Sequence, residues 1–199
     1  PMNSWKKSDS GFKYESHKYH RNMFVIGDED MNLAKRMVKA GSDERKFLRQ
    51  IIVWVDITAP LYWWKEFDTY KVGTVSNSTS TMHKLASTPI TMDCFEMDDF
   101  ESLDNDAIET FWESLIDSLE ALRREYNYTE DKRYWKELIR LLPESWLQKR
   151  TVTMNYENLL AMCSQRRFHK LTEWSNSFIG WVRTLPYAQE LLFLDEFCK

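Results

Sequence analysis

The order of apolar and polar residues predicts one well-marked strand in the first half of the chain. In residues 50–57 every second position, beginning at Ile51, is Ile or Val. Alternation with a period of two and a high content of β-branched residues are typical of a strand with two unlike faces. Ala59 and Pro60 follow, and we expect the strand to terminate there.

A helical period predicts most of the remaining secondary structure. Helices are expected at residues 31–40, 61–70, 107–126, 132–142, 157–167, 170–183 and 187–197. Asp28 or Asp30 suits the N-terminus of the first helix, and Asp104 or Asn105 can cap the third. Gly41 is expected to end the first helix, because glycine is common just beyond a helix C-terminus.

The other segments lack a helical period. Residues 71–81 contain Gly73 and many Ser, Thr and Asn side chains, which compete with the backbone for hydrogen bonds, so we expect a loop. Residues 149–154 are expected to form a short strand, and residues 1–22 an irregular arm or an edge strand. Residues 92–106 carry seven acidic residues and no basic one, which indicates a solvated acidic connection.

These elements predict the α+β class, with helix in the majority and a small antiparallel sheet. The chain has 199 residues, a length that suits one domain. We therefore expect an N-terminal arm or edge strand over residues 1–30 and a single domain over 31–199.

The overall charge argues against one class of partner. The net charge is −4 and the sequence pI about 5.7, whereas a protein that binds duplex nucleic acid normally presents a basic face. No apolar run approaches the ~20 residues that span a membrane. The partners expected from charge and hydropathy therefore include neither duplex nucleic acid nor a membrane.

The cysteines and histidines indicate neither a disulfide framework nor a metal site. Cys94, Cys163 and Cys198 are too few and too scattered for either purpose, which suggests a reducing, cytoplasmic setting. His17 and His20 stand three positions apart, but no third ligand is evident near them.

Two segments could bind an anion. Residues 76–81 read Ser-Asn-Ser-Thr-Ser-Thr, and their hydroxyl and backbone N–H groups could wrap a phosphate; a polar loop with helix-capping residues is the alternative. Arg166, Arg167, His169 and Lys170 form a basic cluster in an acidic chain. These side chains could hold phosphates, or they could offset the negative end of the preceding helix and face water.

Several motifs together resemble the flavin-dependent thymidylate synthases. In that family a helix ending in Gly precedes a strand that runs into Ala-Pro, and Leu-Pro, Thr-x-Asn and paired Leu follow in the C-terminal half. The matching residues are Gly41, Ala59-Pro60, Leu142-Pro143, Thr153-Met154-Asn155, Leu159-Leu160 and Arg166-Arg167. The resemblance covers residues 31–183 and implies the thymidylate-synthase-complementing-like fold.

The chain departs from the family at the positions that carry its chemistry. The family's Arg-His-Arg, which contacts the flavin, aligns with Thr69-Tyr70-Lys71, and its first loop Ser aligns with Thr74. The Ser-x-Arg that grips the pyrimidine nucleotide aligns with Thr79-Ser80-Thr81. The resemblance therefore implies that the backbone around the ligand pocket is retained and that the function has changed.

Our main hypothesis is a nucleotide-binding protein without a catalytic residue, in which FAD is not favoured as cofactor. The ligand-binding candidates are Tyr70, Lys71, Thr74, Ser76, Asn77, Ser78, Thr79, Ser80, Arg166, Arg167 and His169, with Trp63 and Trp64 as pocket aromatics. The family's sites are shared between subunits, which implies a homo-oligomer, expected to be a tetramer.

Three functions remain open at this point. The nucleotide-binding protein could sequester its ligand, as a viral or phage protein would in the cytoplasm of its host. A divergent flavin-dependent synthase that methylates dUMP with FAD is the first alternative. A structural homo-oligomer with a vestigial pocket is the second.

Overall fold

The computed structural model describes residues 7–15, 21–98, 100 and 105–194. His17 and His20 lie outside this part. The helices and strands fall into two units. The first unit comprises Pro1–Val53, Val72–Thr74 and Met154–Lys199, and the second comprises Trp54–Lys71 and Val75–Thr153.

The first unit begins with an antiparallel hairpin where the sequence predicts an arm or an edge strand. Strand β1 (Gly11–Glu15) pairs with β2 (Arg21–Val25), and Phe12 lies opposite Phe24. These two rings meet edge to face, with centroids 5.2 Å apart, and both are exposed. The hairpin therefore presents an aromatic pair to solvent.

Helix α1 (Asp28–Ala40) confirms the predicted amphipathic helix, and it begins three residues earlier. Its first turn is capped from outside the helix. The backbone N–H groups of Glu29 and Asp30 donate to the Asp9 carboxylate, at 2.9 and 3.1 Å. Gly41 follows the helix with a φ of 113°, a value that favours glycine, and this confirms the predicted end.

The rest of the first unit is helical. Its elements are η2 (Arg45–Gln50), α6 (Tyr156–Arg166), the π-helical segment η5 (Glu173–Phe178), α7 (Ile179–Arg183) and α8 (Ala188–Leu191). Asn155 caps α6, because its side chain accepts from the N–H of Asn158 at 3.0 Å and the Asn158 side chain accepts from the N–H of Asn155. The predicted helix 170–183 is thus π-helical in its middle. The predicted helix 187–197 is shorter than expected, and its residues 195–197 lie outside the described part.

The second unit contains a sheet of three strands in the order β3-β5-β4. Strand β3 (Ile52–Pro60) confirms the first strand that the sequence predicts, and β5 (Leu147–Asn155) confirms and extends the second. Strand β4 (Val75–Ser78) shows that the prediction of a loop over 71–81 is wrong there. The local side chains favour a loop, but antiparallel pairing with β5 satisfies the backbone of β4 instead.

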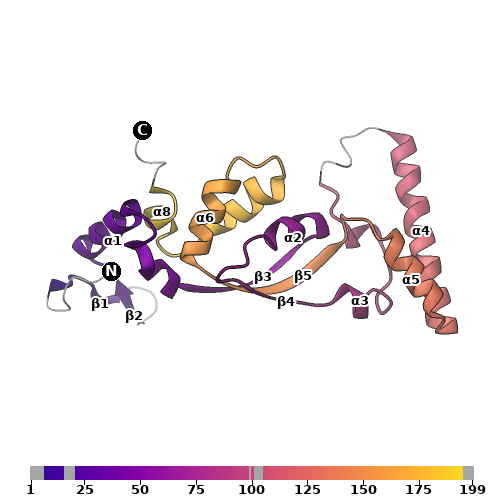
Figure 1. The fold of residues 1–199 in the computed structure, drawn as a ribbon, viewed down its shortest axis with the longest axis horizontal. Coiled ribbons are helices and arrows are strands. Elements are labelled where there is room, and N and C mark those ends of the chain that lie inside the picture. Colours follow the sequence, from indigo (N-terminus) through magenta and orange to yellow (C-terminus); the bar gives the residue numbers. More distant parts are fainter. Residues whose placement is uncertain (1–6, 16–20, 99, 101–104, 195–199) are drawn as a thin grey trace. The chain divides into compact units, whose positions relative to one another are not determined.

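Helix α2 (Leu61–Phe67) packs on one face of this sheet (Figure 1). Trp63 and Trp64 are each 1 % exposed, and their rings meet edge to face at 4.9 Å. The Trp64 Nε1–H donates to the backbone oxygen of Gln148 in β5 at 2.9 Å. The structure therefore places both tryptophans in the core between the helix and the sheet.

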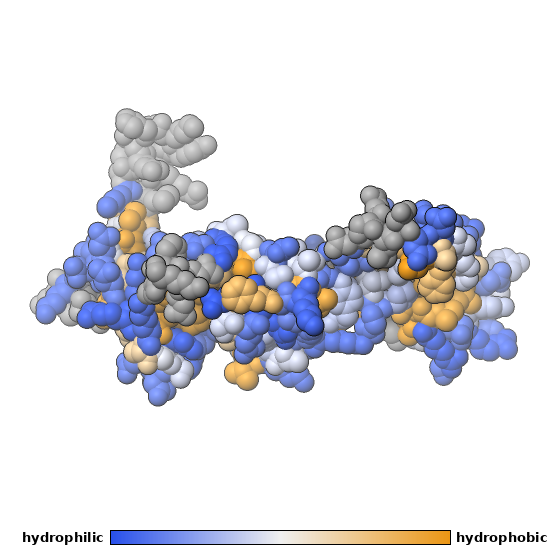
Figure 2. Space-filling model, turned by 90° about the horizontal axis from the view of Figure 1, so that it is seen from above, coloured by the Kyte–Doolittle hydropathy of each residue, from blue (hydrophilic) through white to orange (hydrophobic). Residues whose placement is uncertain are grey.

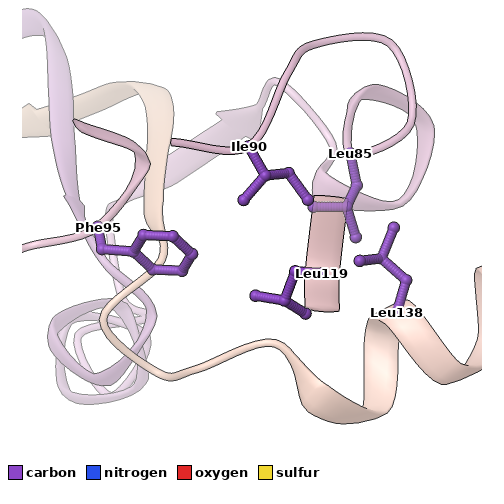
Figure 3. Packing of buried hydrophobic residues seen from close by; sticks show 5 residues of the cluster. All are labelled: Leu85, Ile90, Phe95, Leu119 and Leu138. Atoms are coloured by element: carbon purple, nitrogen blue, oxygen red, sulfur yellow. The ribbon is translucent and has the colours of Figure 1, made fainter. Parts of the chain in front are cut away.

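Helices α4 (Asp106–Thr129) and α5 (Lys132–Leu141) form a helical pair at one end of the second unit (Figure 1). The Asn105 side chain caps α4, as predicted, by accepting from two backbone N–H groups. The pair contributes Leu119 and Leu138 to a cluster of five buried residues that also contains Leu85, Ile90 and Phe95. In Figure 3 Leu85 and Leu138 point toward each other.

The predicted acidic connection is only partly a solvated one. It begins with the short helix η3 (Met92–Cys94), and Phe95 is 4 % exposed and pairs with Trp146 in an isolated β-bridge. The prediction is therefore wrong for Phe95, because an aromatic ring among acidic neighbours still gains by burial. Residues 99 and 101–104 lie outside the described part.

The described structure confirms the α+β class, with helix in the majority. Within the described ranges no helix combines the length and apolar character of a membrane span. The face shown in Figure 2 is mostly hydrophilic, and its apolar residues lie in small separate groups. Whether residues 31–199 form one domain stays a prediction.

Candidate functional site

Strand β4 divides the hydroxyl-rich segment between the two faces of the sheet. Ser76 lies opposite Val152, and Ser78 lies opposite Arg150. Asn77 lies opposite Thr151 on the other face. Side chains of residues paired across an antiparallel ladder project to the same side, so Ser76 and Ser78 share one face and Asn77 takes the other.

The residues after β4 are tied to β5. The N–H and the hydroxyl of Thr79 both donate to the backbone oxygen of Lys149, at 3.0 and 3.1 Å. Ser80 has a φ of 50°, a conformation that few residues other than glycine adopt, and it precedes the short helix α3 (Thr81–Lys84). The Thr81 hydroxyl accepts from Nε2 of Gln148 at 2.8 Å. The end of the segment is therefore fixed by hydrogen bonds.

The segment after α2 offers one cation. The Thr69 hydroxyl donates to the backbone oxygen of Glu66 at 2.7 Å, and the N–H of Tyr70 donates to that of Phe67 at 2.9 Å. The Lys71 side chain is exposed. Thr69 and Tyr70 thus continue the end of the helix, and only Lys71 of this group carries a positive charge.

Thr74 belongs to a short turn of the first unit. Gly73 in this turn has a φ of 81°, and a Cβ there would lie 3.2 Å from polar atoms of Asn155 and Asn158. The Asn158 Nδ2 group also donates to the backbone oxygen of Val72 at 2.6 Å. The turn that carries Thr74 is therefore held against the N-terminus of α6.

The basic cluster follows the end of α6 in the first unit. The guanidinium of Arg166 lies over the Trp174 ring at 5.1 Å, and that of Arg167 lies over the Phe168 ring at 5.1 Å. Nδ1 of His169 accepts from the backbone N–H of Leu171 at 3.2 Å. That bond leaves Nε2 to carry the proton of a neutral imidazole.

Arg167 has a feature that the sequence does not reveal. Its Nε atom is buried, and none of the residues that the structure describes accepts a hydrogen bond from it. A buried donor without an acceptor costs about 1–3 kcal/mol. An anion that reached this nitrogen would remove that cost.

The candidate residues are divided between the two units. Tyr70, Lys71 and residues 76–80 belong to the second unit, and Thr74, Arg166, Arg167 and His169 belong to the first. Their assignment to one pocket therefore stays a prediction.

Sequence reasoning missed Arg150. Its Nε donates to Oε1 of Gln148 at 2.7 Å, its Nη1 to Oδ1 of Asp68 at 2.8 Å, and its guanidinium lies 4.2 Å over the Trp64 ring. The signal lies in the alternation of β5, because Arg150 takes the same face as the buried Val152. A cation at an inward-facing strand position indicates a specific environment.

The opposite face of the sheet carries a second charged group. Nζ of Lys149 lies 2.7 Å from Oδ2 of Asp56, and the Thr151 hydroxyl donates to Oδ1 of Asp56 at 2.6 Å. The hydrogen bonds from Lys149 and Thr151 lower the pKa of Asp56. Trp54 on the same strand is 71 % exposed, so this face is open to solvent in the described structure.

Solved structures with the same arrangement of elements decide the fold. The chain is similar to two crystal structures of flavin-dependent thymidylate synthase from Helicobacter pylori, both with FAD and dUMP. The first has a TM-score of 0.64 at 17 % identity and covers 85 % of this chain and 84 % of its own. The second has a TM-score of 0.63 at 17 % identity, with coverages of 85 % and 83 %.

The fold is that of the flavin-dependent thymidylate synthases. This confirms at the level of the fold the resemblance that the motifs indicate. No family model matches the sequence, and no curated protein matches it either.

The residues of this chain do not fit the flavin in the way that the thymidylate synthase motif implies. In the alignment that the resemblance implies, Thr69 and Tyr70 stand where the family has an Arg and a His, and the Thr69 hydroxyl donates to the backbone oxygen of Glu66. Neither side chain supplies a cation for a phosphate. Within the described ranges no three His, Cys, Asp or Glu side chains gather as metal ligands would.

Proposed function

We propose that this protein binds a nucleotide-type ligand on a thymidylate synthase-like scaffold without catalysing methyl transfer. The observation that carries the proposal is the buried Nε of Arg167, from which no described residue accepts a hydrogen bond. The two similar solved structures are complexes with FAD and dUMP, and both of these ligands carry phosphate.

The neighbourhood of Arg167 suits such a ligand. Arg166 and His169 stand beside it in the chain, and arginine offers a planar fork that matches phosphate oxygens. Phe168 is 87 % exposed, and an exposed ring next to a guanidinium can stack on a base. The cluster therefore combines a site for a charge with a surface for a ring.

Binding is favoured over turnover by the chemistry of the replaced motif. Hydride transfer from a reduced flavin needs two ligands placed tightly against each other. Thr69-Tyr70-Lys71 lacks the two arginines and the histidine of the Arg-His-Arg motif. Thr79-Ser80-Thr81 lacks the arginine of the Ser-x-Arg motif. A protein that holds a nucleotide and does not convert it would sequester it, which is the role we propose.

The test is an isothermal calorimetric titration of purified protein with dUMP, FAD and a panel of mono-, di- and cyclic nucleotides. We expect Arg167→Ala to weaken the binding of the nucleotide at least about tenfold. Arg49→Ala is the matched control, because Arg49 is an exposed arginine of the same unit. Equal affinity in wild type and Arg167→Ala would remove the basic cluster from the proposal.

Three further observations separate the alternatives. A yellow protein, or a saturable rise in visible absorbance on addition of FAD, would favour a flavin enzyme. Recovery of the nucleotide chemically unchanged after long incubation supports sequestration. No binding by any nucleotide would favour a structural role for the scaffold.

The open sheet face supports self-association as part of the proposal. Trp54 is 71 % exposed there, beside the Asp56–Lys149 pair, in which each side chain is 51 % exposed. An exposed indole is typical of an interface, since tryptophan is enriched at such surfaces. We propose a homo-oligomer, with a tetramer as the expected state, and light scattering in solution measures its mass.

A further inference from the structure

The face of the sheet that carries α2 holds an arginine whose hydrogen-bonding capacity is only partly used. Arg150 offers five N–H donors, and two of them go to Gln148 and Asp68. No described residue accepts a hydrogen bond from its Nη2 group. The side chain is 15 % exposed, so part of it still reaches solvent.

This guanidinium is held in one orientation before any ligand arrives. The Trp64 ring lies 4.2 Å from its Cζ, and Trp64 is itself fixed by its bond to the backbone of Gln148. The Gln148 side chain that accepts from Arg150 is fixed in turn by its bond to Thr81. A side chain locked by three neighbours loses little conformational freedom when it binds a ligand.

Two hydroxyl groups stand in line beside the arginine. Ser78 lies directly opposite Arg150 in the β4–β5 ladder, and Ser76 lies one pair further along on the same face. Residues paired in this way have Cβ atoms about 4.5–5.5 Å apart. Both serines are exposed, and no described residue bonds to either hydroxyl.

The acidic partner does not neutralise this site completely. The Asp68 side chain is 52 % exposed, so water and salt screen its interaction with Arg150. The ion pair occupies one edge of the guanidinium and leaves Nη2 free to donate. A bound anion would therefore add to the ion pair and would not need to replace it.

We propose that Arg150, Ser76 and Ser78 form an oxyanion site for a phosphate group on the second unit. Arg150 would donate through Nη2 to the phosphate oxygens, and the two serine hydroxyls would donate from the neighbouring strand. The inference goes beyond the proposed function, because these residues belong to a different unit from Arg166 and Arg167.

The experiment follows the Arg150 side chain by NMR of protein labelled with ¹⁵N at the arginine Nε atoms. The Arg150 signal is assigned by its absence in Arg150→Lys. We expect inorganic phosphate to shift this signal with a dissociation constant on the order of 1 mM, and sodium chloride of equal ionic strength to leave it in place. A nucleoside 5′-monophosphate should act like phosphate, and the nucleoside alone should have no effect.

The double variant Ser76→Ala/Ser78→Ala tests the site without changing Arg150 itself. Both serines are exposed, so their loss should leave the fold intact, and the affinity for phosphate should fall about tenfold. Val75→Ala changes the opposite face of the same strand and serves as the matched control, with unchanged affinity.

Three results would overturn the inference. The first is an Arg150 signal that does not respond to phosphate at about 10 mM, or responds equally to sodium chloride. The second is unchanged phosphate affinity in Ser76→Ala/Ser78→Ala. The third is loss of the Arg150 response in the Arg167→Ala background, where we expect it to persist; that loss would leave the proposed function standing while this inference fails.

Discussion

Glu120 on α4 is expected to contribute more to stability than any exposed carboxylate of that helix. Its side chain is 13 % exposed and accepts from Nε and Nη2 of Arg123, both at 2.7 Å, and from the N–H of Ile90 at 3.0 Å. Nη1 of Arg123 in turn donates to the backbone oxygen of Ala86 at 3.1 Å. The pair therefore fastens the segment that carries Leu85 and Ile90 to the helix.

The contribution of Glu120 to the free energy of unfolding follows from its pKa. The hydrogen bonds from Arg123 lower this pKa from 4.5 to about 2. Each unit of pKa is worth about 1.4 kcal/mol, so the carboxylate contributes roughly 3 kcal/mol to the free energy of unfolding at neutral pH. Because the folded pKa is the lower one, this contribution is complete above pH 4.5 and is lost as the pH falls toward 2. At pH 3 about 1.4 kcal/mol of it remains.

The variant Glu120→Gln removes the charge and keeps the shape. We expect the free energy of unfolding to fall by about 2–3 kcal/mol at pH 7 and by less than half as much at pH 3. Urea unfolding monitored by circular dichroism measures both values. Exchange of the Ile90 amide hydrogen should quicken in parallel. Glu113→Gln, which changes an exposed carboxylate on the same helix, is the control and should cost little.

Two outcomes would refute this reasoning. A loss below about 0.5 kcal/mol at pH 7 would show that Glu120 behaves like an ordinary surface carboxylate. A loss that stays constant between pH 7 and pH 3 would show that the charge of Glu120 is not its cause.

Two further predictions concern the N-terminal cap and the open sheet face. A Cβ on Gly27 would lie 2.1 Å from Cγ of Asp9, so Gly27→Ala should expel the Asp9 carboxylate from the start of α1 and cost about 1 kcal/mol in thermal unfolding. Asp9→Ala should cost the same and the double variant no more; full additivity of the two losses would contradict the shared cause. Trp54→Glu should lower the mass found by light scattering if the open face joins subunits, and an unchanged oligomer would place the interface elsewhere.

Elements with a local signal could be predicted from the sequence. Strand β3 was predictable from the alternation over residues 51–57, and α4 from its helical period and from Asn105 at its start. Gly41 ends α1 because its conformation is a property of the residue itself. In each case the deciding interactions lie within a few positions along the chain.

Features with a distant cause could not be predicted. The cap of α1 comes from Asp9, which lies 20 positions before Glu29, and Phe95 is buried by residues of another segment. Strand β4 exists because β5 pairs with it, although its own composition favours a loop. The residues of the candidate site follow the same rule, since Arg150 acquires its partners Trp64 and Asp68 only through folding.

Strand β4 has a consequence for how its binding properties could change. All four of its residues are exposed and three are polar, so no apolar stripe fixes which residue faces α2. The bonds from Thr79 to Lys149 anchor the strand at one end. Deletion of Ser78 would draw the rest of the strand one position toward this anchor and exchange its two faces. Asn77 would then stand beside Arg150 in place of the serines, and a single short indel could replace hydroxyl ligands by an amide without disturbing the core.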